Sequence, residues 1–385
     1  MSNDLVNKQS IHAKLQHLSI DELNDLIYRY YNGDKTAELI IEYSVNVSPS
    51  GLYKLFPPIV EDTRCLYCEN SLLIRPRQSR SSYYKNSIPT CPACGHQDSK
   101  NCSCSSCFTL RKETEYKNKK IQQEKIFSTY QLNKLTKVKF EDLNLRDKLY
   151  LATLLRAGLD ESLGYIEPVN KYLQILTPSN SMTEELVKSL FHKRIIAVHP
   201  SSSANAFKDE IEDFPNTFYT YKVLYHVNVD EPVDRMLNPD RSSFLEDVDF
   251  CYSLWQEIAL EECKQYLTYS LEKVGFEFSI GEKTVALLKD LLLNFSTSQI
   301  YAIIYRSIAN ATKYYQESKI PKKQAANSVI TNCQRMGERA LAENWIITKY
   351  KRNYDLPATF ISEIFFNRIL GIGNRGFDEP PSLNF

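Results

Sequence analysis

Seven of the ten cysteines in this 385-residue chain lie in one short segment, between residues 65 and 107. Two Cys-x-x-Cys pairs, three later cysteines and one histidine between them make up this set: Cys65, Cys68, Cys91, Cys94, His96, Cys102, Cys104 and Cys107. A Cys-x-x-Cys loop presents two thiolates about one tetrahedral edge apart, and two such loops complete the four-coordinate shell that Zn²⁺ prefers. The segment therefore predicts a structural zinc site.

Two assignments of ligands to zinc fit this spacing. In the first, the pairs at 65/68 and 91/94 bind one ion, and His96 with the last three cysteines binds a second. In the other, the 91/94 pair joins Cys104 and Cys107, which leaves the 65/68 pair short of partners unless the two sites interleave. We favour the first because it uses eight ligands for two tetrahedral sites, although spacing alone does not fix the connectivity. A closed shell leaves no position for water, so a structural role is expected.

The arrangement resembles a four-cysteine zinc ribbon, in which a β-hairpin joins two metal-binding knuckles. The resemblance implies a hairpin in residues 69–90, between the two pairs. An iron–sulfur cluster also uses four cysteines, but two knuckles with Gly95 after the second favour zinc. The insert is basic, with no acid between residues 75 and 85 and four cations there: Arg75, Arg77, Arg80 and Lys85. Arginines beside tyrosines favour phosphate contact and base stacking; the alternative is a solvated loop that keeps the module soluble.

Residues 1–60 predict three short helices. Ser19 and Glu22 form a capping box, and Asn32-Gly33 ends the apolar pattern that follows it. A second helix is expected over residues 36–43. Ser48-Pro49 has the residue types that open a helix, and Pro57-Pro58 closes the third.

The segment Val47–Phe56 resembles the recognition helix of resolvase- and transposase-type helix-turn-helix modules. This resemblance implies that the helix lies in the major groove of DNA. The facing residues would be Ser48, Ser50, Gly51, Tyr53 and Lys54. Glu42 departs from that family, which usually has a small residue there. The alternative is a three-helix lead-in that packs on the zinc module.

The rest of the chain predicts a mainly α fold with a small β wing. After the ribbon (61–115) we expect a basic linker helix over 116–140 and then an α+β domain over 141–240. That domain has helices at 145–157 and 183–192 and strands at 195–198 and 218–229, the order of a winged helix. Residues 241–385 predict a helical bundle, with helices at 246–274, 282–294, 298–317, 321–344 and 358–370. This bundle is the candidate surface for homodimerisation or a protein partner.

Composition limits the classes of function. Lysine plus arginine equals aspartate plus glutamate at 47 each, so any basic footprint is local. The longest apolar runs are far shorter than the ~20 residues that span a bilayer, and the N-terminus lacks a signal-peptide pattern. We therefore expect a soluble, cytoplasmic protein. The Gly-x-Gly-x-x-Gly match at Gly371–Gly376 follows a helix, with nine residues after it, so no nucleotide-binding unit is expected there.

These observations favour a zinc-stabilised nucleic-acid-binding protein, with DNA as the expected partner. A regulator or an accessory factor of a mobile element or defence system would fit. One alternative is a zinc-containing interaction scaffold without nucleic-acid binding. Another is a metal-dependent hydrolase or nuclease that uses residues 192–249, where His192, His199 and His226 lie near several acids. The sequence contains no Walker A motif, no His-Glu-x-x-His and no Gly-x-Ser-x-Gly, so we assign no catalytic residue.

Overall fold

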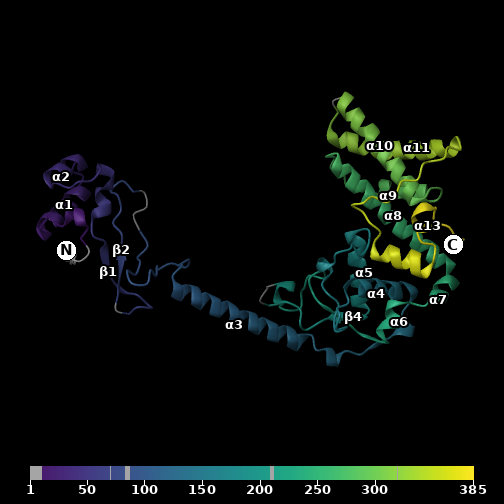
Figure 1. Ribbon diagram of the computed structural model, residues 1–385, viewed down its shortest axis with the longest axis horizontal. Helices are drawn as coiled ribbons and strands as arrows, with labels where there is room; N and C mark the ends of the chain where they lie inside the picture. The colour runs from purple at the N-terminus through teal and green to yellow at the C-terminus, as the bar shows by residue number, and fades with distance from the viewer. Residues whose placement is uncertain (1–10, 70, 83–86, 209–211, 319) are drawn as a thin grey trace. The chain divides into compact units, whose positions relative to one another are not determined.

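The computed structural model describes residues 11–69, 71–82, 87–208, 212–318 and 320–385. Helices dominate these residues, and the strands pair into small two-stranded sheets. The chain divides into two compact units, Met1–Ile121 and Gln122–Phe385. Figure 1 labels most of the helices and some of the strands along the chain. The expectation of a mainly α fold is confirmed.

The first unit begins with the predicted short helices. A 3-10 turn at Ala13–Leu15 precedes α1 (Ile20–Asn32) and α2 (Thr36–Glu42). The capping box is confirmed, because the Ser19 hydroxyl accepts from the Glu22 amide at 3.2 Å and the Glu22 carboxylate accepts from the Ser19 amide at 2.7 Å. Gly33 ends α1 in the left-handed region, at φ +109°. Such a φ suits glycine because it has no Cβ to clash with the backbone.

The predicted third helix is a short 3-10 helix, η3 (Pro49–Leu55), and not an α-helix. Ser48 precedes it without a side-chain capping bond. Leu52, Leu55 and Phe56 are buried against the α1 and α2 residues, so this apolar contact fixes the tight turn, and Pro57-Pro58 prevents a longer helix. Glu42, the departure from the helix-turn-helix family, pairs with Arg29 of α1 at 2.7 Å.

A β-hairpin surrounds the first cysteine pair. Strand β1 (Ile59–Arg64) precedes Cys65, strand β2 (Leu72–Arg75) follows Cys68, and the two are antiparallel. The expected hairpin between the two pairs is therefore misplaced, because the described residues 76–82 and 87–89 form no strand. The first knuckle itself supplies the turn of the hairpin.

Helix α3 (Ser105–Thr129) begins inside the segment predicted as zinc ribbon and ends before residue 140. Its six cations and three acids are spread around the helix, and nearly all of its residues are exposed up to Ile121. Ile126 is its one fully buried residue among those described and belongs to the core of the second unit. A helix that is exposed on all sides over most of its length is typical of a segment that connects compact parts of a chain.

The first part of the second unit contains two α-helices and two small two-stranded sheets. Helix α4 (Leu145–Gly158) lies in the core, and α5 (Asn180–His192) leads into β4 (Ile196–Val198). Strand β4 pairs antiparallel with β5 (Tyr225–Val227), and β3 (Val138–Lys139) pairs parallel with β6 (Val229–Asp230). The predicted strand over 218–229 is thus too long. A turn occupies its first half, where the Lys222 amide donates to the Tyr219 carbonyl.

The helical bundle follows, after the short helices α6 (Val233–Leu237) and α7 (Arg241–Glu246). Its helices are α8 (Val248–Lys273), α9 (Glu282–Leu292), α10 (Thr297–Ser318) and α11 (Lys322–Ala342). Helices α10 and α11 lie side by side (Figure 1). The helix expected over 358–370 is a short α12 (Phe360–Ser362) continued by a π-helix (Glu363–Ile369), and α13 (Arg375–Asp378) follows. No helix in the described residues has the length and apolar character that a membrane crossing requires.

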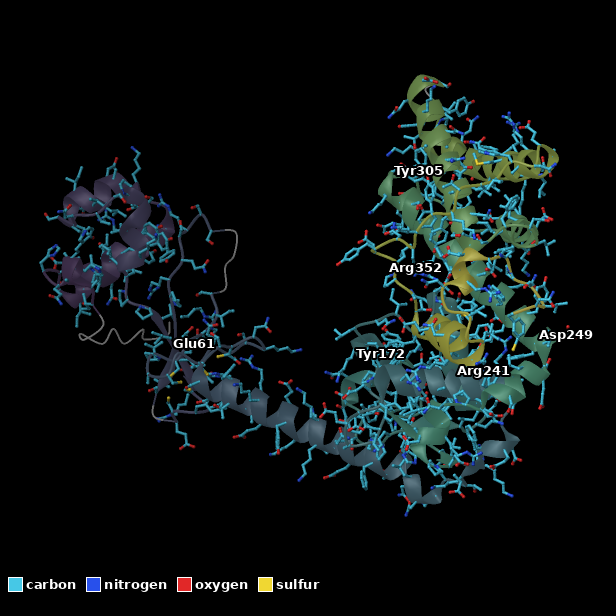
Figure 2. All side chains as sticks on the ribbon, turned by 45° about the vertical axis from the view of Figure 1, so that its right-hand side comes forward. Glu61, Tyr172, Arg241, Asp249, Tyr305 and Arg352 are labelled. Atoms are coloured by element: carbon cyan, nitrogen blue, oxygen red, sulfur yellow. The ribbon has the colours of Figure 1, made fainter. Side chains whose placement is uncertain are left out.

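A buried ion pair fixes the irregular segment between α11 and α12. Glu262 of α8 is 1% exposed and accepts from both terminal nitrogens of Arg352, at 2.9 and 3.2 Å. The Ser362 hydroxyl donates to the same carboxylate at 2.9 Å. Figure 2 labels Arg352 among the side chains of this unit. Because two elements distant in sequence share one buried carboxylate, the pair fixes how the segment packs on α8.

We expect Arg352→Ala to destabilise the second unit by about 3–5 kcal/mol, because Glu262 would stay buried without its partner. Arg339→Ala is the control, since Arg339 pairs with Glu343 on an exposed helix surface and should cost about 0.5 kcal/mol or less. Both tryptophans, Trp255 and Trp345, lie in this unit, so urea unfolding followed by tryptophan fluorescence measures it alone. Equal midpoints for the two variants would contradict this account.

Candidate metal centres

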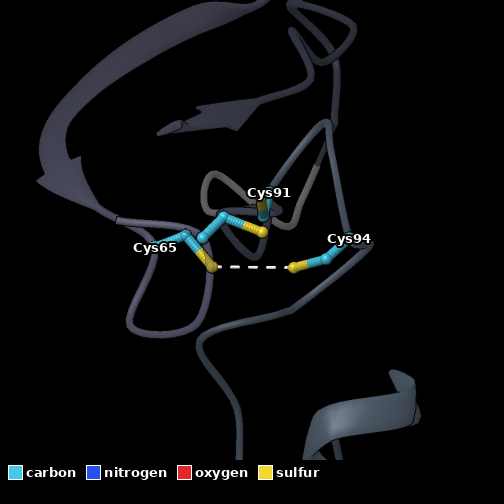
Figure 3. A group of neighbouring side chains, drawn as sticks. Cys65, Cys91 and Cys94 are labelled. Atoms are coloured by element: carbon cyan, nitrogen blue, oxygen red, sulfur yellow. Dashed lines mark hydrogen bonds between the residues drawn. The ribbon is translucent and has the colours of Figure 1, made fainter. Parts of the chain in front are cut away.

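The four cysteines of the two Cys-x-x-Cys pairs converge on one point. Their sulfur atoms all lie within 4.8 Å of one another, and Cys65 Sγ is 3.6 Å from Cys94 Sγ. Figure 3 shows these two sulfurs facing each other beside Cys91. The cysteines are not disulfide-bonded. A tetrahedron with Zn–S bonds of about 2.3 Å has edges of about 3.8 Å, so this spacing fits a shared metal ion.

Backbone geometry builds both knuckles in the same way. The residue after each pair has a left-handed backbone, Glu69 at φ +41° and Gly95 at φ +69°. The Glu69 amide donates to the Cys65 carbonyl at 3.0 Å, and the Gly95 amide donates to the Cys91 carbonyl at 2.9 Å. These turns direct both cysteines of each pair toward the same side, which is the geometry a chelating pair needs.

A second cluster contains the remaining four predicted ligands. His96 Nδ1 lies 3.4 Å from Cys102 Sγ, 3.7 Å from Cys104 Sγ and 3.3 Å from Cys107 Sγ. A zinc ion with three sulfur ligands and one nitrogen ligand has sulfur–nitrogen edges of about 3.6 Å. The ligand atoms group as in the first of the two assignments, with four residues in each cluster.

The second cluster also forms the beginning of α3. The Cys107 amide donates to Cys104 Sγ at 3.4 Å, and the Phe108 amide donates to the Cys104 carbonyl at 3.0 Å. Cys104 therefore occupies the N-cap position of α3. Its sulfur accepts the backbone hydrogen bond that a side-chain oxygen usually accepts at an N-cap. The Cys107 amide lowers the pKa of Cys104, but burial and the neighbouring thiols of Cys102 and Cys107 outweigh it, so the pKa of Cys104 is raised.

Backbone amides stabilise one thiolate in each cluster. Amide donation from Gln97, at 3.1 Å, and then from Cys104 lowers the pKa of Cys102 to about 6. Burial opposes ionisation of Cys91, but amides of Cys94 and Ala93 outweigh it and lower its pKa to about 6. The pKa of Cys94 is raised to about 12, because the surrounding thiols outweigh the amide of His96. Crowded thiols cannot all ionise unless a cation neutralises them.

The chemistry of these side chains therefore fits two metal ions. Thiolates with an imidazole are the soft donors that zinc prefers, and a divalent ion would neutralise the repulsion within each cluster. Both sites have four protein ligands. An ion held by all four ligands would have a closed shell, with no coordination position for a substrate.

The predicted phosphate-binding arginines also make contacts inside the first unit. Arg75 pairs with Glu61 of β1 at 2.8 Å, and Arg77 Nε donates to the Pro57 carbonyl at 3.0 Å. Arg80 reaches the end of α1, where it donates to the Tyr30 and Asp34 carbonyls at 3.1 and 2.6 Å and lies over the Tyr30 ring. No pattern in the sequence predicts these hydrogen bonds and this ion pair. Lys85 lies outside the described residues.

The same three arginines line a recess of about 400 Å³. Hydroxyl groups share its wall, from Tyr31 and from Ser79, Ser82 and Ser87. The Tyr31 hydroxyl donates to the Gln78 carbonyl at 2.6 Å and so holds the loop that carries the arginines. Of the predicted groove-facing residues, Ser48, Ser50 and Lys54 are exposed, whereas Gly51 and Tyr53 are half-buried.

Histidines of the second unit form a looser arrangement. His226 lies in β5 and His199 directly follows β4, and their ring centres are 6.5 Å apart. Burial lowers the pKa of both histidines. In the described part of residues 192–249, no three side chains of the metal-binding types converge. The buried Cys251, Cys263 and Cys333 belong to the core of this unit.

Fold and sites together define a mainly helical protein with a cysteine-rich segment able to hold two metal ions. Comparison with known proteins finds no match, whether to a protein family, a curated protein or a solved structure. Function is therefore argued from the sites themselves.

The purified protein is expected to contain two zinc ions per chain, measured by elemental mass spectrometry against protein concentration. Cys104→Ser should reduce this content by about one ion, because three ligands hold zinc much less tightly than four. Cys251→Ser, which changes a buried cysteine outside both clusters, should retain both ions. A wild-type content near zero would contradict the assignment of both clusters.

Zinc retention should depend on pH in a defined direction. Cys91 and Cys102, with pKa values of about 6, are thiolates at pH 7 and take up protons as the pH falls through 6. Protons then compete with the metal for the thiolates, so zinc should be retained at pH 7 and released progressively as the pH is lowered to 4. Zinc release to a chromogenic chelator at a series of pH values measures this. A release that is constant from pH 7 to pH 4 would contradict the ligand assignment.

Proposed function

We propose that this is a zinc-stabilised nucleic-acid-binding protein of the cytoplasm, with DNA as the partner. The observation that carries the proposal is the recess lined by Arg75, Arg77 and Arg80 in the same unit as the two metal centres. Zinc in both clusters would fix the hairpin that carries these arginines. A regulator or an accessory factor of a mobile element or defence system is the role that fits such a module.

The contacts of the arginines support phosphate binding. Arg80 donates to two backbone carbonyls, and because a guanidinium has five N–H donors, others remain for a ligand. Carbonyl oxygens carry no net charge and do not neutralise the cation of Arg80. Since these contacts already order the side chain, less conformational entropy is lost when a phosphate binds. Arginine also suits phosphate because its donors form a planar fork.

Two further surfaces of the first unit would extend the contact. On η3 and at the residue before it, the candidates for reading base edges are Ser48, Ser50, Tyr53 and Lys54. On α3, Lys117 and Lys120 are exposed and have no carboxylate within ion-pair distance in the described residues. These lysines would add contacts to the phosphate backbone that do not depend on sequence. The helical bundle of the second unit would dimerise or bind a protein partner.

A zinc-stabilised interaction scaffold is the second candidate. The observation in its favour is that α3 exposes large apolar side chains, among them Phe108, Leu110, Tyr116 and Ile121. A protein partner would bury such residues, whereas a nucleic-acid backbone would not. The pairing of Arg75 with Glu61 also reduces the positive charge of the recess. The two candidates differ in how binding responds to salt.

Duplex DNA binding by the full chain should weaken as salt rises, with a linear log–log dependence that counts phosphate contacts. Replacement of Arg80 by glutamine should reduce the magnitude of this slope by about one, whereas Arg80→Lys retains the charge and should retain most of the slope. Lys35→Ala is the control, because Lys35 is exposed and pairs with Glu38 outside the recess. Fluorescence anisotropy at several salt concentrations gives the slopes.

Zinc content measured on each variant shows whether the module is intact. A wild-type slope near zero, or equal slopes for Arg80→Gln and the wild type with both zinc ions bound, would contradict DNA binding through this recess. Either result would favour the scaffold.

A further inference from the structure

Tyr67 lies between the ligands of the first cluster and contacts the ligands of the second. Its backbone amide donates to Cys65 Sγ at 3.5 Å, inside the first knuckle. Its ring stands edge-on to the imidazole of His96, with ring centres 4.9 Å apart and planes at 85°. Its hydroxyl oxygen is 3.5 Å from Cys107 Sγ. One residue therefore contacts ligand groups of both clusters.

His96 provides a second connection. Its carbonyl accepts from the Cys91 amide at 2.7 Å, so its backbone belongs to the second knuckle of the first cluster. Its side chain, through Nδ1, belongs to the second cluster. The other three ligands of that cluster lie close together at the start of α3. The second cluster is therefore complete only when the 91/94 knuckle directs His96 toward it.

We propose that the two metal centres bind cooperatively, that the Cys65/Cys68/Cys91/Cys94 centre fills first, and that Tyr67 is the positioning residue that couples them. This inference rests on the proposed zinc sites. Metal at the first centre folds both knuckles, which brings His96 and Tyr67 to the second. The ring of Tyr67 then sets the orientation of the imidazole, and its hydroxyl can donate to the thiolate of Cys107.

The size of the effect follows from two physical rules. Groups that orient or hydrogen-bond metal ligands typically change metal affinity by about 10–100-fold when removed. Binding at coupled sites is reciprocal, so metal at the second centre must also strengthen the first by the same factor. The order of filling then depends on which centre is preorganised. Only the second centre uses a ligand, His96, whose backbone is held by the knuckle of the first centre.

Native mass spectrometry of the full chain, freed of metal and titrated with zinc under reducing conditions, tests the coupling directly. Cooperative binding should keep the one-zinc species below the statistical proportion at half saturation. Tyr67→Ala should weaken binding of the second zinc by about tenfold or more and let the one-zinc species accumulate. Tyr67→Phe keeps the ring and should give a smaller effect. Leu66→Ala, at an exposed position of the same knuckle, should match the wild type.

Cobalt substitution separates coupling from a general loss of structure. The sulfur-to-cobalt charge-transfer absorption of the second equivalent should shift in Tyr67→Phe, because the hydroxyl no longer meets the Cys107 thiolate. The absorption of the first equivalent should not change. A statistical zinc distribution in the wild type, or Tyr67→Ala and Tyr67→Phe both indistinguishable from it, would overturn the proposal.

Ligand variants test the order of filling. Cys65→Ser with Cys68→Ser should reduce zinc well below one ion per chain, because without metal at the first centre His96 and Tyr67 are no longer held toward the second. Cys104→Ser with Cys107→Ser should leave close to one ion. One ion in both double variants would show independent centres and overturn the inference while leaving the zinc sites intact. No zinc in the wild type would instead overturn the proposed function.

Discussion

Repulsion between crowded thiolates is the constraint on which the first unit depends. Seven cysteines and a histidine meet in two clusters with sulfur spacings too long for disulfides and close to the edges of a zinc tetrahedron. Backbone amides lower the pKa of Cys91 and Cys102, whereas the pKa of Cys94 is raised to about 12 because the neighbouring thiols outweigh the amide of His96. Metal binding would therefore supply folding free energy to a segment whose buried apolar cluster, among the residues that the structure describes, is Leu73 with the candidate ligands Cys65 and Cys91.

The hairpin built on the first cluster carries the contacts that organise the rest of this unit. Arg80 joins the loop after β2 to the end of α1, and Arg77 joins it to the chain before β1. Cys104, which belongs to the second cluster, precedes the first residue of α3 and caps that helix. The metal centres thus lie between the helical lead-in and the exposed helix. The second unit depends on different interactions, a large apolar core and the buried pair of Glu262 and Arg352.

Sequence reasoning succeeded where the signal was local. The capping box at Ser19 and the helices α8 to α11 follow from periodicity and end residues, and ligand counting favoured the grouping that the two clusters have. It failed where distant contacts decide the outcome. Burial of Leu52 and Leu55 limits the third helix to a 3-10 turn, and the turn at Tyr219–Lys222 shortens a predicted strand. No sequence pattern predicts the hydrogen bonds of Arg80 to the end of α1 or the contact of Tyr67 with the second cluster.

X-ray absorption at the zinc edge tests the central claim most directly, because it reports the atoms bound to the metal. The full chain should show seven sulfur ligands and one nitrogen ligand shared between two zinc ions, with Zn–S distances of about 2.3 Å. No metal–metal distance short enough for a cluster should be seen. A shell dominated by oxygen or nitrogen, or an absorption edge belonging to iron, would contradict the account of this protein as a two-zinc module.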